Sequence, residues 1–343
     1  MSDTLALLQE LVSAPGPPGQ EGAVREILAE HIAAMDRDAK VDAKGNLSVD
    51  LGGGVPPKVV VTAHMDEIAM IVRAVDVDGH LMVGPMGGLY PWKLGEGPVL
   101  VMGSGRHIPG VLSLGSIHTD DPESTVAAAG SEAISWDMAT VATGLSEGEI
   151  ADCGVRPGTR VVVHPSRRQL TVLGDLVSGY FLDDRADLVS WLLALKALKG
   201  KTLPVLFAAT ASEEVGGEGA QYLLHKIQPD VCIALELGPN VPDAPVEIND
   251  QPTVWATDSY ATMAADDGEL VDKVGQKLGL ALQFQALSRG GSDASCSAGR
   301  GLCARPITLG LPMENSHGYE IIHPGSMENL AKLTASLVKA LTA

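Results

Sequence analysis

Two pairs of adjacent carboxylates are the residues of this chain best suited to chemistry. Asp183-Asp184 lies in FLDDRADL and Glu213-Glu214 lies in ATASEEVGGEG, each beside an apolar run. Like charges buried together without a counter-cation are costly, so pairs in such places imply that something positive binds beside them. Metal ions are the expected cations, and we expect two of them.

Histidines offer nitrogen ligands for the same ions. His64 and Asp66 are two residues apart at the end of the apolar run VVVTAH, so their side chains project from the same face of a strand. Asp66 is therefore placed to hold the second ring nitrogen of a metal-bound His64, although a capped core histidine would explain this pair if it stood alone. His317 lies in PMENSHGYE, after the short apolar segment PITLG.

The glutamate pair suits general base chemistry. It follows the predicted strand LPVLFAAT, so one carboxylate can bind a metal while its neighbour takes a proton from the attacking water. A solvated turn is the alternative for Glu213-Glu214 in isolation. Glu236 ends the next apolar run, VCIALE, where an acid needs a partner.

The aspartate pair is more restricted in its geometry. In an extended trans backbone Asp183 and Asp184 face opposite ways, so one of them reaches a metal comfortably and Arg185 could neutralise the other. A helix N-cap would also explain the pair by itself. Four of these features nevertheless fall at the carboxyl ends of predicted strands, where open α/β sheets form their sites. Two histidines and several carboxylates, without a thiolate, favour zinc, cobalt or manganese.

The elements that must position these residues alternate between helices and strands. Residues 1–70 and 174–343 predict an α/β fold with a doubly wound mixed sheet that forms a di-metal catalytic domain. Residues 71–173 have short apolar runs separated by turns, which predict an inserted small all-β, barrel-like domain. The predicted helices cover residues 5–12, 21–35, 185–198, 219–226, 268–278 and 327–341, and the predicted strands include 59–64, 204–209 and 231–235.

Composition excludes several classes of protein. With 343 residues and 45% hydrophobic content, the chain is long enough for two domains. A net charge of −19 argues against nucleic acid or an anionic membrane as partner, and no run approaches the ~18 apolar residues of a membrane span. The N-terminal stretch lacks the features of a secretion signal, so a cytoplasmic location is expected. Four widely spaced cysteines predict reduced, buried thiols.

The stretch SRGGSDASCSAG, residues 288–299, is a candidate substrate-side loop. It lacks the Gly-Lys-Ser/Thr of a phosphate loop and does not predict a strong helix, so a substrate-side loop and a simple turn both remain open. In the first case Arg289, Gly290, Gly291 and Asp293 would contact substrate. Arg289 would then meet an acidic side chain of the substrate, and a salt bridge within this acidic protein is the alternative.

The order of these motifs resembles one known family. AHMDEI, WDMATVATGLSEGEIADCGVRPG, FLDDRADL, SEEVGGEGA, GGSDA and HGYE are similar to segments of the tetrahedral, dodecameric metalloaminopeptidases, the family that also holds glutamyl aminopeptidases and proteins once labelled endoglucanase M. The likeness covers nearly the whole chain. It implies an aminopeptidase that removes N-terminal residues from short peptides and uses two divalent metal ions per subunit.

Carried over residue by residue, the resemblance implies a role for each candidate ligand. Asp183 would bridge the two metals. His64 and Glu236 would complete one site, and Glu214 and His317 would complete the other.

The resemblance also implies a mechanism and an assembly. Glu213 would be the general base, with Asp66 orienting His64. A hydroxide between the two ions would attack the peptide carbonyl, and the metals would stabilise the oxyanion. Relatives enclose their active sites in a hollow shell of twelve subunits, so a homododecamer is implied, with the inserted domain contributing to assembly.

Two departures from the family pattern motivate alternatives. The family usually has Asp where this chain has Glu236, and its final histidine usually stands in a HSPxE setting where this chain has HGYE. A metal-dependent deacylase or amidohydrolase acting on small N-acylated dipeptides is the first alternative. The second, a catalytically idle scaffold that keeps the shell, is disfavoured by the intact carboxylate pairs and histidines.

Overall fold

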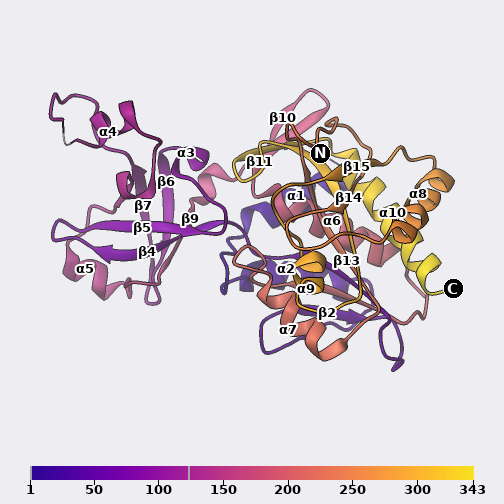
Figure 1. Cartoon of the computed structure of the whole chain (residues 1–343). Coiled ribbons are helices and arrows are strands. Elements are labelled where there is room, and N and C mark those ends of the chain that lie inside the picture. Colours follow the sequence, from indigo (N-terminus) through magenta and orange to yellow (C-terminus); the bar gives the residue numbers. More distant parts are fainter. Residues whose placement is uncertain (1, 123) are drawn as a thin grey trace. The chain divides into compact units, whose positions relative to one another are not determined.

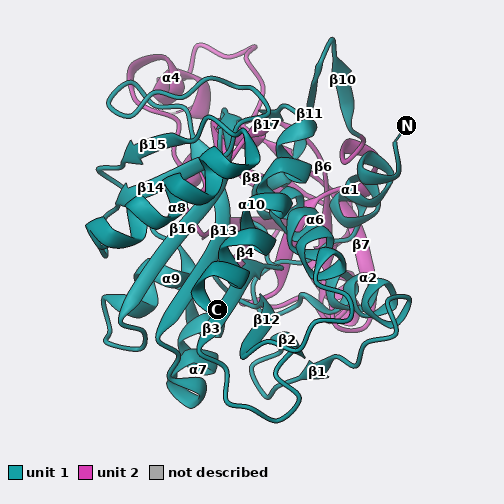
Figure 2. Cartoon of the chain, turned by 90° about the vertical axis from the view of Figure 1, so that its right-hand side faces the viewer, with its two compact units in different colours: residues 1–67, 170–316, 320–343 teal, residues 68–169, 317–319 magenta. Residues whose placement is uncertain are grey.

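The structure, a computed structural model, describes residues 2–122 and 124–343 and divides into two compact units. The larger unit comprises Met1–Glu67, Leu170–Ser316 and Glu320–Ala343. The smaller unit comprises Ile68–Gln169 together with His317–Tyr319, and Figure 2 colours the two units separately. In sequence, Ile68–Gln169 therefore lies between the segment that carries His64 and the segment that carries Asp183.

A mixed sheet forms the centre of the larger unit (Figure 1). Its middle strands are parallel and run in the order β12 (Val205–Thr210), β3 (Val59–His64), β13 (Val231–Pro239) and β16 (Arg305–Glu314). β3 and β12 are buried along their whole length, which explains why each is a continuous apolar run in the sequence. The remaining strands are β1 (Lys40–Val41), β2 (Leu47–Asp50), β10 (Thr171–Leu173), β11 (Leu176–Tyr180), β14 (Thr253–Thr257), β15 (Gln283–Ala286) and β17 (Tyr319–Ile322).

Helices cover both faces of this sheet. They are α1 (Asp3–Ser13), α2 (Gly22–Ala33), α6 (Leu182–Ala197), α7 (Glu218–Ile227), α8 (Ala265–Leu278), α9 (Asp293–Ala298) and α10 (Gly325–Leu341). Alternate residues of β3 point to opposite faces, because the side-chain period of a strand is two. Val59 and Val61 pack in a core with α1, α2, α6, α8 and α10, whereas Val60 packs with residues of α7 and α9. This arrangement confirms the predicted doubly wound fold.

The smaller unit is a closed antiparallel barrel. Its strands follow the order β4 (Ala69–Val75), β5 (His80–Met86), β8 (Thr140–Ala142), β7 (His107–Ser113), β6 (Gly97–Met102) and β9 (Arg160–Val163). Buried and less buried residues alternate along β7, as expected for a wall with one inward face. Short helices connect the strands: α3 (Pro91–Leu94), α4 (Thr125–Ser131), α5 (Glu147–Asp152), η1 (Trp136–Met138) and η2 (Pro165–Arg167).

Two local predictions from the sequence are wrong. Glu236 does not end its strand, because β13 stays paired in parallel with β16 as far as Pro239 and Met313. The stretch 288–299 is not only a loop or turn, since its second half forms α9. A capping box at Ser292 starts this short helix, and most of its residues are buried against the sheet.

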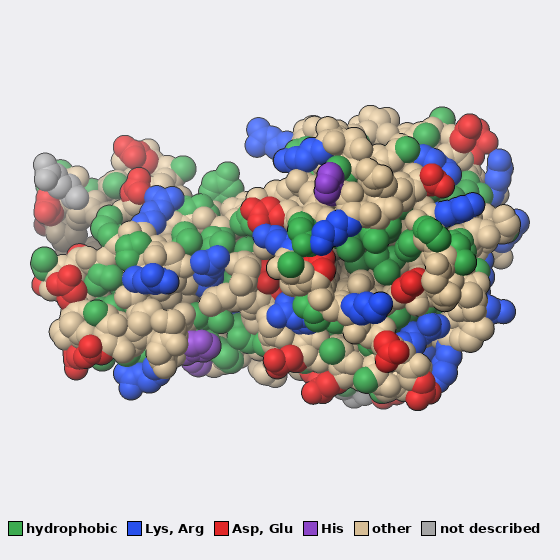
Figure 3. All heavy atoms as spheres, turned by 90° about the horizontal axis from the view of Figure 1, so that it is seen from below, with side chains coloured by type: hydrophobic (Ala, Val, Ile, Leu, Met, Phe, Trp, Pro, Cys, Tyr) green, Lys and Arg blue, Asp and Glu red, His purple; other side chains and the backbone are tan. Residues whose placement is uncertain are grey.

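Three further observations concern the helices, the cysteines and the surface of the chain. None of the helices within residues 2–122 and 124–343 is long and apolar enough to cross a membrane. The four cysteines, Cys153, Cys232, Cys296 and Cys303, are free and buried, which confirms the prediction of buried thiols. On the face seen in Figure 3, basic side chains are scattered among acidic ones.

Candidate active site

His64 is the last residue of β3, and its imidazole is 2% exposed. Its Nδ1 lies 3.0 Å from the backbone oxygen of Asp66 and 3.6 Å from an oxygen of the Asp66 carboxylate. A carbonyl oxygen can only accept, so Nδ1 carries a hydrogen and donates it. Nε2 then faces two carboxylates, at 3.2 Å from Asp183 Oδ1 and 4.0 Å from Glu236 Oε2.

The aspartate pair opens α6, and both carboxylates are buried beside His64. The peptide bond between Asp183 and Asp184 is cis, not the extended trans bond considered from the sequence. The backbone N–H of Asp183 donates to Glu320 Oε2 at 3.0 Å, and Asp184 Oδ2 accepts the backbone N–H of His64 at 2.7 Å. Asp184 therefore fixes the strand end that carries the histidine.

Arg185 does not neutralise Asp184, as the sequence suggested it could. Its guanidinium is fully buried and turns to the segment after β3, where Nη1 donates to the backbone oxygen of Met65 and Nη2 lies 2.8 Å from Glu67 Oε2. Glu67 is also fully buried, so the positive charge is matched there.

Four of these side chains form a group able to hold a cation. One ligand atom each from His64, Asp183, Asp184 and Glu236 lies within 4.8 Å of the others, and all four residues are buried. Asp184 was not assigned as a ligand from the sequence, because adjacent residues of an extended strand point apart. Without a cation, Nε2 can face these carboxylate oxygens only if His64 is protonated. With a cation at the centre of the group, a neutral His64 could turn the lone pair of Nε2 toward it, as the carboxylates turn their oxygens.

The electrostatics of the group agree with this geometry. Burial, followed by the charge of Asp183, raises the pKa of Glu236 well above its usual range. Burial and then Asp187 likewise raise the pKa of Asp184, and burial raises that of Asp187 to about 7. Burial lowers the pKa of His64, but the surrounding carboxylates outweigh it and hold that pKa well above the ordinary value. The buried surroundings alone therefore do not stabilise the ionised form of all these carboxyl groups.

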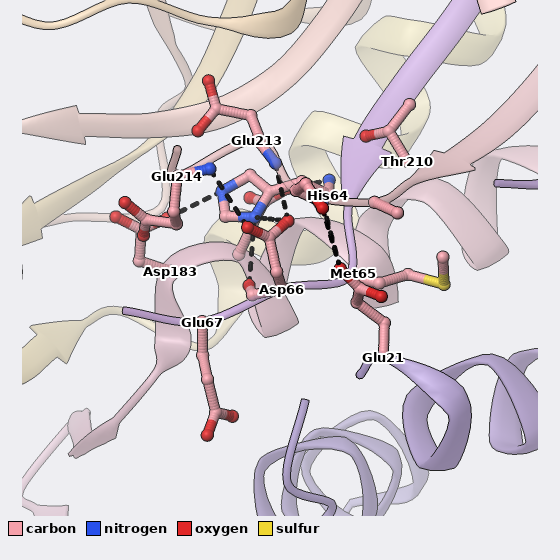
Figure 4. Close-up of polar contacts among 12 residues, drawn as sticks. Glu21, His64, Met65, Asp66, Glu67, Asp183, Thr210, Glu213 and Glu214 are labelled. Carbon is pink, nitrogen blue, oxygen red and sulfur yellow. Dashed lines mark hydrogen bonds and ion pairs between the residues drawn. The ribbon is translucent and has the colours of Figure 1, made fainter. Parts of the chain in front are cut away.

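Glu213 and Glu214 follow β12 and approach the same group (Figure 4). Their backbone N–H groups donate to the two oxygens of Asp66, at 2.8 Å from Glu213 and 3.0 Å from Glu214. Burial raises the pKa of Glu213 well above its usual range, and neighbouring carboxylates, Asp293 first among them, add to the effect. Asp66 therefore serves both the histidine, chiefly through its carbonyl, and the glutamates, through its carboxylate.

The remaining residues singled out in the sequence lie in different places. Arg289 and Gly290 are exposed in the loop before α9, and Gly290 has a positive φ of 93°. Gly291 is half-buried, and a Cβ there would meet the ring of Tyr260. Asp293 is not presented with them: it is 3% exposed, and its Oδ2 accepts the hydroxyl of Thr210 at 2.6 Å.

His317 groups with the smaller unit. Its Nδ1 lies 2.9 Å from the backbone oxygen of Gly88, and its φ is 59°. A carbonyl partner at Nδ1 leaves Nε2 as the nitrogen with a lone pair. Its role as a metal ligand remains a prediction from the sequence.

A doubly wound α/β unit with a buried imidazole and buried carboxylates beside its central strands, interrupted in sequence by a barrel, is the arrangement expected of a metal-dependent hydrolase. The family model described as M42 glutamyl aminopeptidase matches residues 45–333. The chain belongs to this family, which confirms the resemblance drawn from its motifs. It is an aminopeptidase, a hydrolase that acts on peptide bonds.

Similar proteins include aminopeptidases of different names. A lysyl aminopeptidase of Pyrococcus furiosus is 26% identical, over 98% of this chain and 96% of its own. A glutamyl aminopeptidase of Lactococcus lactis is 28% identical, over 64% and 62%. The TET1 peptidase of Pyrococcus horikoshii, described as able to assemble into a tetrahedron or a large octahedral shell, superposes with a TM-score of 0.86 at 28% identity, covering 98% of this chain and 99% of that one.

Proposed function

We propose that two divalent metal ions, of zinc, cobalt or manganese, bind at this site. His64, Asp183 and Glu236 would hold the first ion. As the sequence resemblance implies, Asp183 would be shared with a second ion that Glu214 and His317 would hold. The observation that carries the proposal is the convergence of His64 Nε2 on two buried carboxylates, 3.2 and 4.0 Å away. This donor set contains no thiolate and suits these three metals.

The chain's own residues supply the proton transfers. Divalent ions at such a site polarise a peptide carbonyl and lower the pKa of water. The carboxylate of Glu213 accepts the proton of the attacking water and delivers it to the nitrogen of the leaving amine. The backbone N–H of Glu213 donates to Asp66 Oδ1 at 2.8 Å, which holds the main chain in place. The carboxylate of Glu213 is not used in this bond, so it can accept the proton.

The proposed substrates are short peptides with a free N-terminus. Relatives named as lysyl and glutamyl aminopeptidases show that preference for the first residue varies among similar proteins. Arg289 is exposed near α9 and has no ion pair within the described chain, so it is the proposed contact for an acidic substrate side chain. We propose a cytoplasmic location, which the four free cysteine thiols support.

The proposal is tested by turnover of a panel of aminoacyl-nitroanilides and N-acyl dipeptides, with zinc, cobalt and manganese each supplied to metal-stripped protein. Release of nitroaniline only with metal present is the expected result. Hydrolysis of N-acyl dipeptides alone would replace the proposal with the deacylase alternative. No turnover with any metal would favour an idle scaffold.

We propose further that the chain forms a closed homododecamer through its smaller unit. Similar structures are described as dodecamers or tetrahedral shells. The smaller unit exposes a stacked aromatic pair, Tyr90 and Trp92, whose rings lie 5.7 Å apart and whose exposed fractions are 56% and 54%. Large aromatic rings left in water are typical of association surfaces, because burying them contributes much of an interface's energy.

A further inference from the structure

The loop that carries the proposed base is held by an unusual set of bonds. Four successive backbone N–H groups, from Ala211 to Glu214, donate to side-chain oxygens and not to another strand. Ala211 donates to Asn46 Oδ1 at 3.0 Å, and Ser212 donates to Glu21 Oε1 at 3.1 Å. The next two donate to Asp66, as described above. The main chain of this loop is therefore fixed by residues far away in the sequence.

Ser212 is the weak point of the loop. Its φ is 57°, in the left-handed region that a residue with a Cβ adopts at a cost of ~1–2 kcal/mol. Without an external restraint the serine would favour another backbone conformation, and the direction of the following Glu213 would change with it. The side-chain restraint on Ser212 is Glu21, whose Oε1 accepts both the backbone N–H and the hydroxyl of Ser212, the latter at 3.3 Å. The backbone oxygen of Ser212 also accepts the N–H of Glu218 at 3.1 Å, so Glu21 holds the side of the peptide that this bond does not reach.

Glu21 is itself well fixed. It is 3% exposed, it immediately precedes α2, and its Oε1 also accepts the backbone N–H of Gly19 at 2.6 Å. Val24 and Leu28 bury α2 in the main core. The main chain of Glu21 is held by the packed helix, so its carboxylate oxygen has a defined position. That oxygen can therefore fix the position of the loop that donates hydrogen bonds to it.

We propose that Glu21 is a positioning residue for the aminopeptidase reaction: by holding Ser212 in the left-handed conformation, it directs the carboxylate of Glu213 toward the reacting water. This inference rests on the proposed role of Glu213 as the base. Figure 4 shows Glu21 below the loop, on the side of Asp66 away from Glu214. Three groups donate to the same atom, Glu21 Oε1: the backbone N–H of Gly19, the backbone N–H of Ser212 and the hydroxyl of Ser212. We therefore expect the position of this oxygen to matter more for the loop than the negative charge of Glu21.

Three substitutions separate position from charge. Glu21→Gln keeps an oxygen at the same reach and should retain kcat within about three-fold. Glu21→Asp keeps the charge but shortens the reach, and Glu21→Ala removes the acceptor, so each should lower kcat, by roughly 10- to 100-fold for Glu21→Ala. KM and metal content per chain should stay near those of the parent protein. Glu26→Ala, on the exposed face of α2, is the matched control.

A second-site change tests the backbone argument directly. Glycine adopts a φ near +57° at little cost, so Ser212→Gly in the Glu21→Ala background should recover about five-fold in kcat. Amide hydrogen exchange of the metal-loaded protein gives a readout that does not depend on turnover. The Ser212 amide should exchange at least ~10-fold faster in Glu21→Ala than in the parent, while the amide of buried Leu28 is unchanged.

The outcomes are distinct. An inactive Glu21→Gln beside an active Glu21→Asp would show that charge is what matters and would overturn the proposal. So would a Glu21→Ala protein with parental kcat, or a Ser212→Gly change that gives no recovery. If Glu21→Ala fails to fold, the Gln and Asp variants still decide between the two explanations. A fully active Glu213→Gln protein would instead refute the assigned base, and the exchange result at Ser212 would stand by itself.

Discussion

The guanidinium of Arg185 binds the carboxylate of Glu67 at 2.8 Å, and neither side chain is exposed to solvent. The same guanidinium donates to the backbone oxygen of Met65, so it contacts both neighbours of Asp66. Gly16 makes room for it, because a Cβ there would lie 2.8 Å from Arg185 Nη2. The ion pair thus joins the start of α6, which carries Asp183, to the segment that carries Asp66.

Breaking this pair should destabilise the protein strongly. Arg185→Met removes the guanidinium that lies 2.8 Å from buried Glu67, and we expect a loss of about 3–5 kcal/mol in the free energy of unfolding. The double variant Arg185→Met/Glu67→Leu should regain much of that loss, since neither charge of this ion pair then remains without the other. Denaturant titration of the metal-free protein measures both. Arg289→Met, which removes an exposed arginine, is the control, and an equal loss in single and double variants would contradict the argument.

Glu213→Gln should lower kcat by roughly two to four orders of magnitude while metal content stays near that of the parent protein, because a base is lost and a ligand is not. Asp183→Ala should instead lose metal, because the proposed bridge holds both ions. Metal analysis of dialysed protein beside steady-state kinetics separates the two effects. Parental turnover in Glu213→Gln would refute its role, and full metal content in Asp183→Ala would place the bridge elsewhere.

The metal site should be adapted to the side chain of Glu236, which is one methylene longer than the Asp usual in the family. It lies inside β13 and its carboxylate accepts its neighbour Leu237's backbone N–H at 2.9 Å, so the side chain is confined near His64. Glu236→Asp should fold but bind metal less tightly, with activity that recovers when metal is in excess. Glu236→Gln should lose more, because a neutral amide is a weaker ligand. Normal activity of Glu236→Gln at low free metal would show that this residue is not a ligand.

Arg289→Ala should change selectivity more than catalysis. If the exposed guanidinium meets an acidic substrate side chain, the ratio of kcat/KM for glutamyl over alanyl nitroanilide should fall about ten-fold, which corresponds to one partly exposed charged contact. The value for the alanyl substrate should stay within about two-fold. Arg300→Ala, which removes another exposed arginine near α9, is the control. An unchanged ratio would remove Arg289 from the substrate site.

The proposed assembly predicts a large particle that depends on exposed aromatic rings. Tyr90→Ser/Trp92→Ser should reduce the mass measured by light scattering, because the rings would lose the area that they bury between subunits. Val77→Ser, at a site 89% exposed in the same unit, should leave the mass unchanged. A parent protein that is a stable and active monomer would refute the need for a shell.

The main strands could be predicted because burial on both faces leaves a continuous apolar run in the sequence, as in β3 and β12. Acids that follow such runs stand out as candidate ligands, and their role as ligands remains a prediction. The residues that hold the loop of Glu213 in place, such as Glu21 and Asn46, could not be predicted from any pattern in the sequence. Glu21 is 191 residues from Ser212 in sequence, and Asn46 is 165 residues from Ala211, so no spacing rule connects them. The prediction that Glu236 ends its strand was wrong because the end of β13 is decided by pairing with β16 and not by local composition.

The barrel's place within the chain bears on how the protein is made. β3 pairs with β12 and β13, and all of Ile68–Gln169 lies between β3 and these partners in sequence. The barrel pairings span shorter stretches of chain: β4 pairs with the next strand β5 and β6 with β7, and even the β4–β9 pairing, Met70 with Val161, is more local than the pairing of Val59 with Val205. Because long loops are costly to close, the barrel should form early and the central sheet late. During synthesis on the ribosome, VVVTAH should therefore remain unpaired until β12 has emerged, and an apolar strand left unpaired in that interval is a site where aggregation can begin or a chaperone can bind.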